Sequence, residues 1–415
     1  MSENKRAKSS TDQSFAGLKA FVNWLIVGVV LACAFAYGIS AVRVIVACLL
    51  FVWVLAGPFL FSWCLVDLAS RSFMDGHYDL SEKLARLALA VDELVKPLVM
   101  VFGMAYSPFS LFNCLNLANA LMVNGQFADS EAVLKQALKQ TEALPDFQLS
   151  LTPLILSHMA TVILYRGDFN QAEDLLERST TIKTNRLQLN TLSVDERMSL
   201  ELGVAADLYT TGGLFEKCRQ YDLAEKCFKD ALDRVERFAE NLDPEGELKS
   251  NFLNGLGDLY LKLGRAREAE PYIYEARRLR GLKFTADHPI MSSSYDNLGR
   301  FKTATGEYVE AEKWLEKARK IRQRYGRKNP ADLADTMRSL GQLKVAEGNL
   351  SEALELFAKA TVMKQKAFGD TFPDVADMLE EKAVVMQRLG DEGGASAALE
   401  VAEKIRDKFS LRQKF

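Results

Sequence analysis

The chain has 415 residues, of which 48% are hydrophobic and 26% are charged, a composition that excludes wholesale disorder. Its net charge is −3, and because residues 1–66 hold five basic and two acidic side chains, the rest of the chain carries −6. A general polyanion binder would be basic, so we expect no nucleic-acid partner. The six cysteines show no CxxC spacing, which argues against a disulfide framework or a structural zinc site.

Two apolar segments near the N-terminus predict a transmembrane helical hairpin over residues 19–66. Residues 20–66 contain a single charged side chain, Arg43, and together they are twice as long as one membrane-crossing helix needs to be. A turn just before Arg43 would create two antiparallel spans, 19–37 and 44–66, after an N-terminal tail of residues 1–18.

The basic residues around these spans predict the orientation of the chain. The tail and the start of the first span carry Lys5, Arg6, Lys8 and Lys19, and the second span is followed by Arg71, Lys83 and Arg86. Because only Arg43 lies between the spans, both ends of this multi-pass membrane protein are expected in the cytoplasm. A cleavable signal is the alternative, since residues 34–36 (Ala-Phe-Ala) resemble a cleavage site, but the second span would still leave the C-terminal part cytoplasmic.

A fixed period organises the C-terminal part of the chain. Gly264, Gly306, Gly348 and Gly390 recur at a constant 42-residue spacing, and the same residue types return around each of them. The recurring residues are Leu256-Gly257, Leu298-Gly299 and Leu340-Gly341 before the glycine, then Ala269, Ala311, Ala353 and Ala395, then Ile273, Leu315, Phe357 and Leu399, then Ala276, Ala318, Ala360 and Ala402 after it. This pattern predicts helical hairpins in which small residues allow close packing, a large apolar residue fills the gap and glycine turns the chain.

The period weakens toward the N-terminus but continues. Gly125 and Gly167 are separated by the same 42-residue spacing, Gly76 begins an earlier unit, and one more unit fits if six residues are inserted after Gly213. Eight units then account for nearly everything after the membrane segment. We expect divergent units over 67–249, regular units over 250–408 and a C-terminal tail over 409–415, with Pro289, Pro330 and Pro373 opening the first helix of three regular units.

These residues resemble the tetratricopeptide repeat. The 42-residue spacing, together with Ala-Asp-His-Pro at 286–289, is similar to the longer repeats of kinesin light chains, and the match extends over residues 250–405. The resemblance implies an all-α, right-handed solenoid of helical hairpins with a concave groove for a protein or peptide. Chaperone-docking members of the family clamp a terminal carboxylate with two lysines, two asparagines and an arginine, a set that the corresponding surface here lacks.

The sequence contains no recognisable catalytic motif. HExxH, GxSxG and GxxxxGK[ST] are all absent, and His77, His158 and His288 have no metal-ligand or nucleophile partner at a recognisable spacing. We therefore expect no enzymatic activity, no metal and no cofactor; an enzyme would need a site built from groove residues without a known motif. The basic run at 317–328 is interpreted either as a helix end favoured by the helix dipole or as a site for anionic lipid or an acidic partner.

The candidate site is the concave face formed by the first helix of every unit. The 42-residue period predicts which side chains of these helices point toward the concave face. They are Asn251, Asn254, Asp258, Asp296, Arg300, Asp335, Arg338, Gln342, Asp377, Glu380 and Gln387. Amides and charges of both signs suit an extended peptide, although an ordinary solvated groove has the same composition. Upstream the equivalent face is more apolar, with Phe112, Leu115, Leu154 and Leu164, which suits an amphipathic helix or another copy of the chain.

The sequence thus predicts a membrane-anchored scaffold or adaptor that binds a partner protein or peptide in its groove at the cytoplasmic face. The alternative is a structural membrane protein that forms a homo-oligomer through the transmembrane hairpin and the N-terminal repeats.

Overall fold

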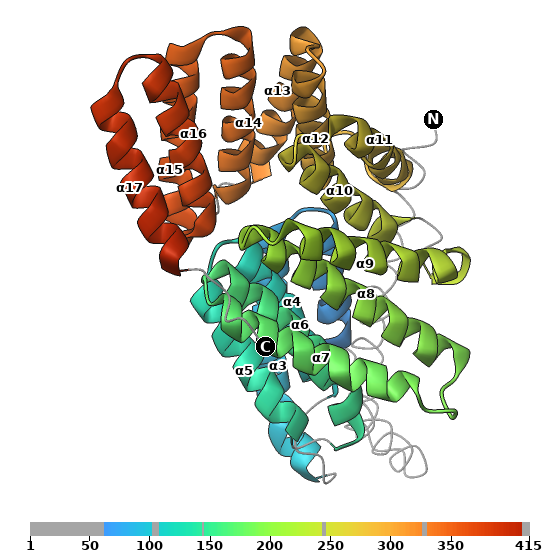
Figure 1. Ribbon diagram of the computed structural model, residues 1–415. Coiled ribbons are helices and arrows are strands. Elements are labelled where there is room, and N and C mark those ends of the chain that lie inside the picture. Colours follow the sequence, from blue (N-terminus) through green and yellow to red (C-terminus); the bar gives the residue numbers. More distant parts are fainter. Residues whose placement is uncertain (1–61, 102–107, 143–144, 243–245, 326–329, 409–415) are drawn as a thin grey trace, which may run out of the picture. The chain divides into compact units, whose positions relative to one another are not determined.

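The computed structural model describes residues 62–101, 108–142, 145–242, 246–325 and 330–408. These residues form helices joined by turns, with no strand among them, which confirms an all-α helical-repeat solenoid (Figure 1). Among the helices described, none is both long and apolar enough to cross a membrane. The first predicted span, 19–37, and most of the second, 44–66, lie outside the described residues.

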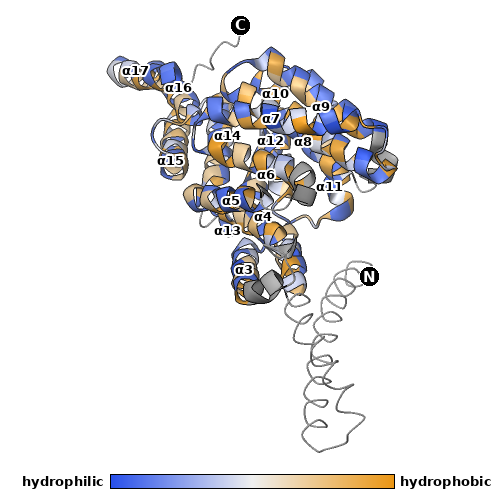
Figure 2. Cartoon of the chain, turned by 90° about the horizontal axis from the view of Figure 1, so that it is seen from below, coloured by the Kyte–Doolittle hydropathy of each residue, from blue (hydrophilic) through white to orange (hydrophobic). Residues whose placement is uncertain are grey.

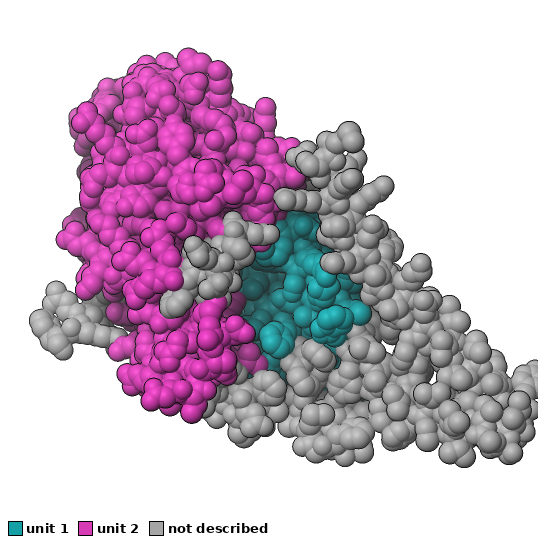
Figure 3. Space-filling model, turned by 90° about the vertical axis from the view of Figure 1, so that its right-hand side faces the viewer, with its two compact units in different colours: residues 1–148 teal, residues 149–415 magenta. Residues whose placement is uncertain are grey.

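The chain divides into two compact units, residues 1–148 and residues 149–415 (Figure 3). The 42-residue period does not mark this boundary. Hydrophilic and hydrophobic residues both occur along the helices of each unit, as expected for helices that each bury one side (Figure 2). The described helices pair into consecutive helical hairpins, two in the first unit and six in the second.

The first unit contains a helix over residues 62–74, α3 (Tyr78–Val101), α4 (Pro108–Val123) and α5 (Phe127–Glu142). The predicted turn glycines Gly76 and Gly125 lie between the paired helices, both with φ of 78°. Two small residues of the first hairpin, Ala69 and Ala85, and two leucines of α4, Leu117 and Leu121, form one buried core cluster.

A repeated hydrogen bond also holds these two hairpins. The Ser81 hydroxyl donates to the Ala69 carbonyl, and the Ser130 hydroxyl donates to the Ala118 carbonyl, each at 2.8 Å and each across twelve residues. Both serines are fully buried. The weak upstream repeat is therefore the same structural unit, with serine at the position where the regular units carry alanine.

The second unit contains α6 (Pro145–Tyr165), α7 (Phe169–Leu187), α8 (Val194–Lys217), α9 (Tyr221–Leu242), α10 (Glu247–Lys262), α11 (Ala266–Lys283), α12 (Met291–Ala304), α13 (Tyr308–Tyr325), α14 (Ala331–Glu347), α15 (Leu350–Phe368), α16 (Pro373–Arg388) and α17 (Glu392–Lys408). Only the first residues of α6 precede the boundary at 148. Successive first helices α10, α12 and α14 contact one another, so they form one layer of the solenoid and the second helices form the other.

The Leu-Gly pairs explain why two helices of a regular hairpin approach closely. A Cβ atom added to Gly299 would lie 2.5 Å from Leu315 Cγ, and one added to Gly341 would lie 2.8 Å from Phe357 Cε1. Any side chain at these glycines would therefore displace the large residue of the second helix. This confirms the packing that the repeat pattern predicts. The equivalent large residue of the last hairpin, Leu399, remains 39% exposed.

One turn departs from the predicted pattern. Gly213 lies inside α8, and the chain turns six residues later at Arg219, which occupies the position of the turn glycines. Arg219 has φ of 58°, and among the described residues other than glycine it alone has positive φ. The six-residue insertion is therefore an extension of the first helix by almost two turns. It brings the C-terminal end of α8 to the site described next.

Candidate ligand-binding cavity

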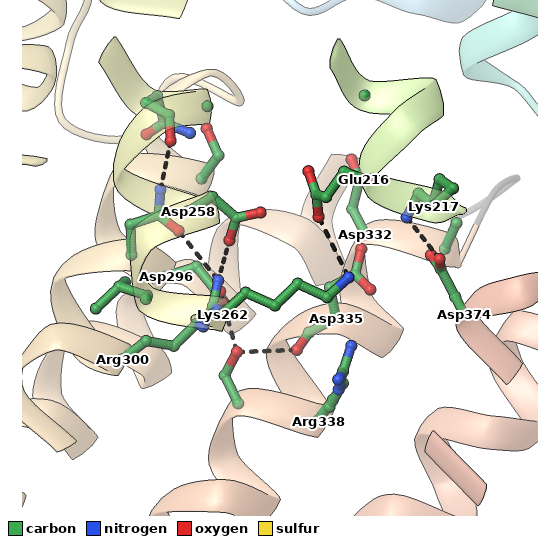
Figure 4. A pocket seen from close by; sticks show the side chains of 18 of the residues that line it. Glu216, Lys217, Asp258, Lys262, Asp296, Arg300, Asp332, Asp335, Arg338 and Asp374 are labelled. Atoms are coloured by element: carbon green, nitrogen blue, oxygen red, sulfur yellow. Dashed lines mark hydrogen bonds and ion pairs between the residues drawn. The ribbon is translucent and has the colours of Figure 1, made fainter. Parts of the chain in front are cut away.

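The second unit contains a cavity of about 660 Å³ on the side of its first helices (Figure 4). Residues of α6, α8, α10, α12, α14 and α16 line it, which is the first helix of each of the six hairpins. A cavity of this volume lies in the range of ligand-binding clefts. The helices that the period assigns to the concave face therefore contribute most of the cavity lining.

Most of the predicted site residues line this cavity. They are Asn254, Asp258, Asp296, Arg300, Asp335, Arg338 and Gln342. Asn251 does not; its side-chain oxygen accepts a hydrogen bond from Arg280 Nη2 at 2.8 Å. Asp377 and Glu380 also lie outside the lining, and they form ion pairs with Arg219 and Arg406. The role of these residues in binding stays a prediction.

A basic residue late in each second helix explains many of these positions. Arg280, Arg322, Lys364 and Arg406 recur at the 42-residue spacing, and we call them the inward cations. Their side chains reach back to the first helix of the same hairpin. The acceptors are Asn251 and Asn254 for Arg280, Asp296 for Arg322, Asp335 for Lys364, and Asp377 and Glu380 for Arg406. Six of the predicted site residues therefore hold the two helices of a hairpin together.

Arg280 differs from the other inward cations because its guanidinium donates to neutral groups. It is 4% exposed, and its acceptors are amide, hydroxyl and carbonyl oxygens, including Asn251 Oδ1 and Ser294 Oγ. Burial lowers the pKa of Arg280 to about 10. At the 42-residue spacing, Asn251 corresponds to Asp335 and Asp377, and Asn254 to Asp296 and Glu380, so asparagine stands where the partners of the other inward cations are carboxylates.

The remaining predicted residues join neighbouring hairpins. Arg300 pairs with Asp258, which lies one period earlier in the chain, and Arg338 pairs with Glu381 of the following hairpin at 2.7 Å. Gln342 Nε2 donates to the same Glu381 carboxylate at 2.8 Å. The repeat period places such residues side by side on adjacent first helices, so the pairing follows directly from it.

A further group of ion pairs connects the second and third hairpins of the second unit with its last hairpin. Lys217 Nζ lies 2.5 Å from Asp374 Oδ1, Arg219 Nη2 lies 2.9 Å from Asp377 Oδ1, and Lys262 Nζ lies 3.4 Å from Asp377 Oδ2. We call these pairs the closure contact, because α8 and α10 thereby meet α16 across more than one hundred residues of sequence. Figure 4 shows the Lys217–Asp374 pair at the edge of the cavity.

Aromatic rings reinforce the closure contact. Tyr165 stacks on Phe368 with ring centroids 5.5 Å apart and an interplanar angle of 12°, and Phe169 meets Phe372 edge-to-face at 6.3 Å. Such pairs contribute roughly 1 kcal/mol each beyond the area they bury. The solenoid of the second unit is therefore bent back on itself by both apolar and ionic contacts.

The electrostatics of the closure contact favour the charged forms. Burial alone would raise the pKa of Asp374, but Lys217 and Lys364 outweigh it and hold that pKa below its ordinary value. The pKa of Asp377 is likewise lowered, because Lys262 and Arg338 overcome its burial. Burial would lower the pKa of Lys217, yet Asp374 raises it above its ordinary value. Both partners stay ionised around neutral pH.

Several lining residues are missing from the sequence prediction. Glu216, Lys217, Lys262, Asp332, Lys364 and Asp374 all line the cavity. Lys364 could have been found from the 42-residue spacing of the inward cations. The same spacing identifies Arg322, which the sequence places in the basic run 317–328 and the structure places in the cavity wall, with its side chain 10% exposed. Lys217 and Asp374 carry no such signal.

The cavity offers charged and polar groups for binding and no evident reactive centre. In the described part of the chain, no cluster of three or more histidine, cysteine, aspartate or glutamate side chains could hold a metal ion. Helical-repeat solenoids of this kind typically act as binding scaffolds. That the chain is not an enzyme stays a prediction.

Comparison with known proteins supports the repeat assignment. The tetratricopeptide repeat model matches residues 248–324 and 290–366, so the helical hairpins within residues 248–366 are similar to tetratricopeptide repeats. No curated protein sequence matches the chain. A solved kinesin light chain of Podosopora anserina with nearly identical TPR-like repeats is 20% identical, covering 48% of this chain and 93% of that chain, with a TM-score of 0.34.

Two solved structures are similar over most of the chain. A Rap protein complexed with Competence and Sporulation Factor is 13% identical, covering 84% of this chain and 98% of that chain, with a TM-score of 0.54. The Rap conjugation gene regulator of the plasmid pLS20, in complex with the Phr* peptide, is 12% identical, covering 85% and 96%, with the same TM-score. At these identities the likeness concerns the fold alone.

Proposed function

We propose that this protein is a membrane-anchored tetratricopeptide-repeat scaffold that holds an extended peptide segment of a partner in the cavity of its second unit. The observation that carries the proposal is the cavity itself, about 660 Å³, lined by the first helix of all six hairpins. Its lining mixes aromatic rings, amides and charges of both signs, which suits backbone and side-chain recognition of a peptide.

The likeness to known structures is consistent with this role. Two proteins of similar fold were solved in complex with Competence and Sporulation Factor and with the Phr* peptide. A repeat solenoid of this size therefore has room for such a ligand. The proposal extends to this chain only the general capacity to enclose a peptide.

The membrane part of the proposal rests on the sequence. Residues 20–66 hold one charge, Arg43, and basic residues flank both predicted spans, 19–37 and 44–66. On this proposal the two spans anchor the chain and the basic flanks keep both ends in the cytoplasm. The repeats would then present their cavity to partners at the cytoplasmic face.

A test of cavity binding needs a variant that blocks the cavity without breaking an ion pair. Arg300 and Arg338 are unsuitable, because each pairs with a carboxylate. Gly213 is suitable: it lines the cavity inside α8, and a Cβ atom there would have no heavy atom within 4 Å. Gly281 in α11 is the matched control, because it is equally open but lies outside the cavity lining.

We expect Gly213→Phe to weaken the binding of fluorescein-labelled random nonapeptides at least tenfold, measured by fluorescence anisotropy, while Gly281→Phe leaves binding unchanged. Neither change should lower the melting temperature, since glycine inside a helix is itself unfavourable by up to about 1 kcal/mol. Equal binding by both variants would refute a peptide site in the cavity.

A further inference from the structure

Every basic side chain that lines the cavity is paired with a carboxylate. Each contacts at least one lining carboxylate: Lys217 with Asp374, Lys262 with Glu216, Arg300 with Asp258, Arg322 with Asp296, Arg338 with Glu381, and Lys364 with both Asp335 and Asp374. The lining contains one further carboxylate, Asp332. No ion pair of its carboxylate is found in the described part of the chain.

Asp332 is held in place by its backbone while its side chain stays accessible. It lies in the first turn of α14, and its carbonyl oxygen accepts a hydrogen bond from Arg322 Nη1 at 2.8 Å. The residue is exposed, and it lines the cavity. Figure 4 labels it among the residues that line this pocket. The nearby lysines Lys217 and Lys364 are already engaged by Asp374.

The surroundings of Asp332 suit a basic side chain. Tyr165 and Phe368 line the same cavity and stack on each other. Asp332 lines the same cavity as these two rings. Lysine and arginine combine an apolar stem, which packs against aromatic rings, with a charged head that a carboxylate binds.

Arg322 adds a second feature to this corner of the cavity. Its side chain is 10% exposed, and its buried Nε has no hydrogen-bond acceptor in the described part of the chain. A buried donor without an acceptor costs roughly 1–3 kcal/mol. Arg322 Nη1 is already engaged by the backbone carbonyl of Asp332, so this guanidinium fixes the backbone of Asp332 and is not itself open to a ligand.

We propose that the cavity selects peptides carrying a lysine or arginine, and that the carboxylate of Asp332 binds the basic head group while Tyr165 and Phe368 contact its stem. This inference rests on the proposed function, because it specifies the ligand of the same cavity. Among the lining carboxylates, Asp332 alone has no ion pair in the described part of the chain. The positive charge of a lysine or arginine in the peptide would pair with it.

The test compares three fluorescein-labelled nonapeptide pools that differ only at the central residue: arginine, norleucine or glutamate. Binding to the full-length protein in detergent is measured by anisotropy. We expect the arginine pool to bind at least tenfold more tightly than the other two, and Asp332→Asn to abolish this preference. Asp332→Glu should retain it. Asp287→Asn, the same charge change at an exposed residue outside the cavity lining, should leave it unchanged.

The outcomes separate this inference from the proposed function. If all pools bind and Gly213→Phe weakens them equally, the cavity holds peptides without the proposed selectivity, and the role of Asp332 is refuted. An arginine preference that survives Asp332→Asn also refutes it. If no pool binds the wild-type chain, both the proposed function and the inference fall.

Discussion

Asp374 is the residue on which the closure contact depends most. It is 5% exposed and pairs with both Lys217 and Lys364, at 2.5 and 3.1 Å. Removing one member of a buried ion pair leaves its partner uncompensated, which typically costs about 3–5 kcal/mol. We expect Asp374→Asn to lower the free energy of unfolding of the second unit by about 3 kcal/mol at pH 7, measured by urea denaturation.

The pH dependence of this loss follows from the lowered pKa of Asp374. A carboxylate whose pKa is lower in the folded state stabilises the fold above its ordinary value of 3.8, and the stabilisation is lost as pH falls below it. The difference in the free energy of unfolding between wild type and Asp374→Asn should therefore be constant from pH 8 to pH 5 and shrink only below about pH 4. A gap that closes between pH 8 and pH 5 would show that the ion pair is absent.

The candidate site could be predicted only in part at the level of residues. The period places Asp296 and Asp335 correctly on the inward side of their helices. It does not reveal that Arg322 and Lys364 reach across from the second helix to bind them. The cations look like ordinary helix-end residues favoured by the helix dipole, and only their common 42-residue spacing indicates a shared inward role.

At the level of elements, the turn between α8 and α9 places Arg219 in an unfavourable left-handed backbone conformation, while its side chain forms ion pairs with α16. Left-handed backbone costs a non-glycine residue roughly 1–2 kcal/mol, and Arg219 adopts it with φ of 58°. Its guanidinium meets Asp377 and Glu380 on α16. Because the arginine side chain is 41% exposed, these pairs contribute little stability individually.

Two substitutions at this turn separate backbone from side chain. Arg219→Ala loses the ion pairs and keeps the strained backbone, whereas Arg219→Gly loses the ion pairs and relieves the strain. We expect the glycine variant to be more stable than the alanine variant by about 1 kcal/mol in urea denaturation. Gly306→Ala, at a regular turn with φ of 82°, should cost a similar amount. Equal stability of the two Arg219 variants would contradict the strain.

The elements themselves were largely predictable. Glycine spacing predicts the hairpins from Gly76 to Gly390, because each turn needs positive φ and each close helix pair needs small residues. Gly213 misled the prediction, since a glycine also fits inside a helix where open space lies beside it. The extension of α8 could not be predicted from the glycine spacing, because this turn carries Arg219 where the other turns carry glycine.

At the level of the whole molecule, the 42-residue period predicts contacts between adjacent hairpins only. Lys217 and Asp374 are 157 residues apart, and no repeat relation links them. Contacts between hairpins far apart in the second unit depend on the accumulated rotation from one hairpin to the next, which composition and spacing do not specify. The enclosed cavity is therefore visible only in the structure.

The most direct test of the account follows membrane attachment and ligand binding together. Vesicles carrying the full chain are washed with alkaline carbonate, neutralised, incubated with the labelled arginine pool and sedimented. We predict that the full chain and the peptides sediment, that Gly213→Phe sediments without them, and that residues 62–415 alone hold the peptides in the supernatant. A full chain lost in the alkaline wash would contradict the anchor, and peptides that sediment equally with Gly213→Phe would contradict the cavity.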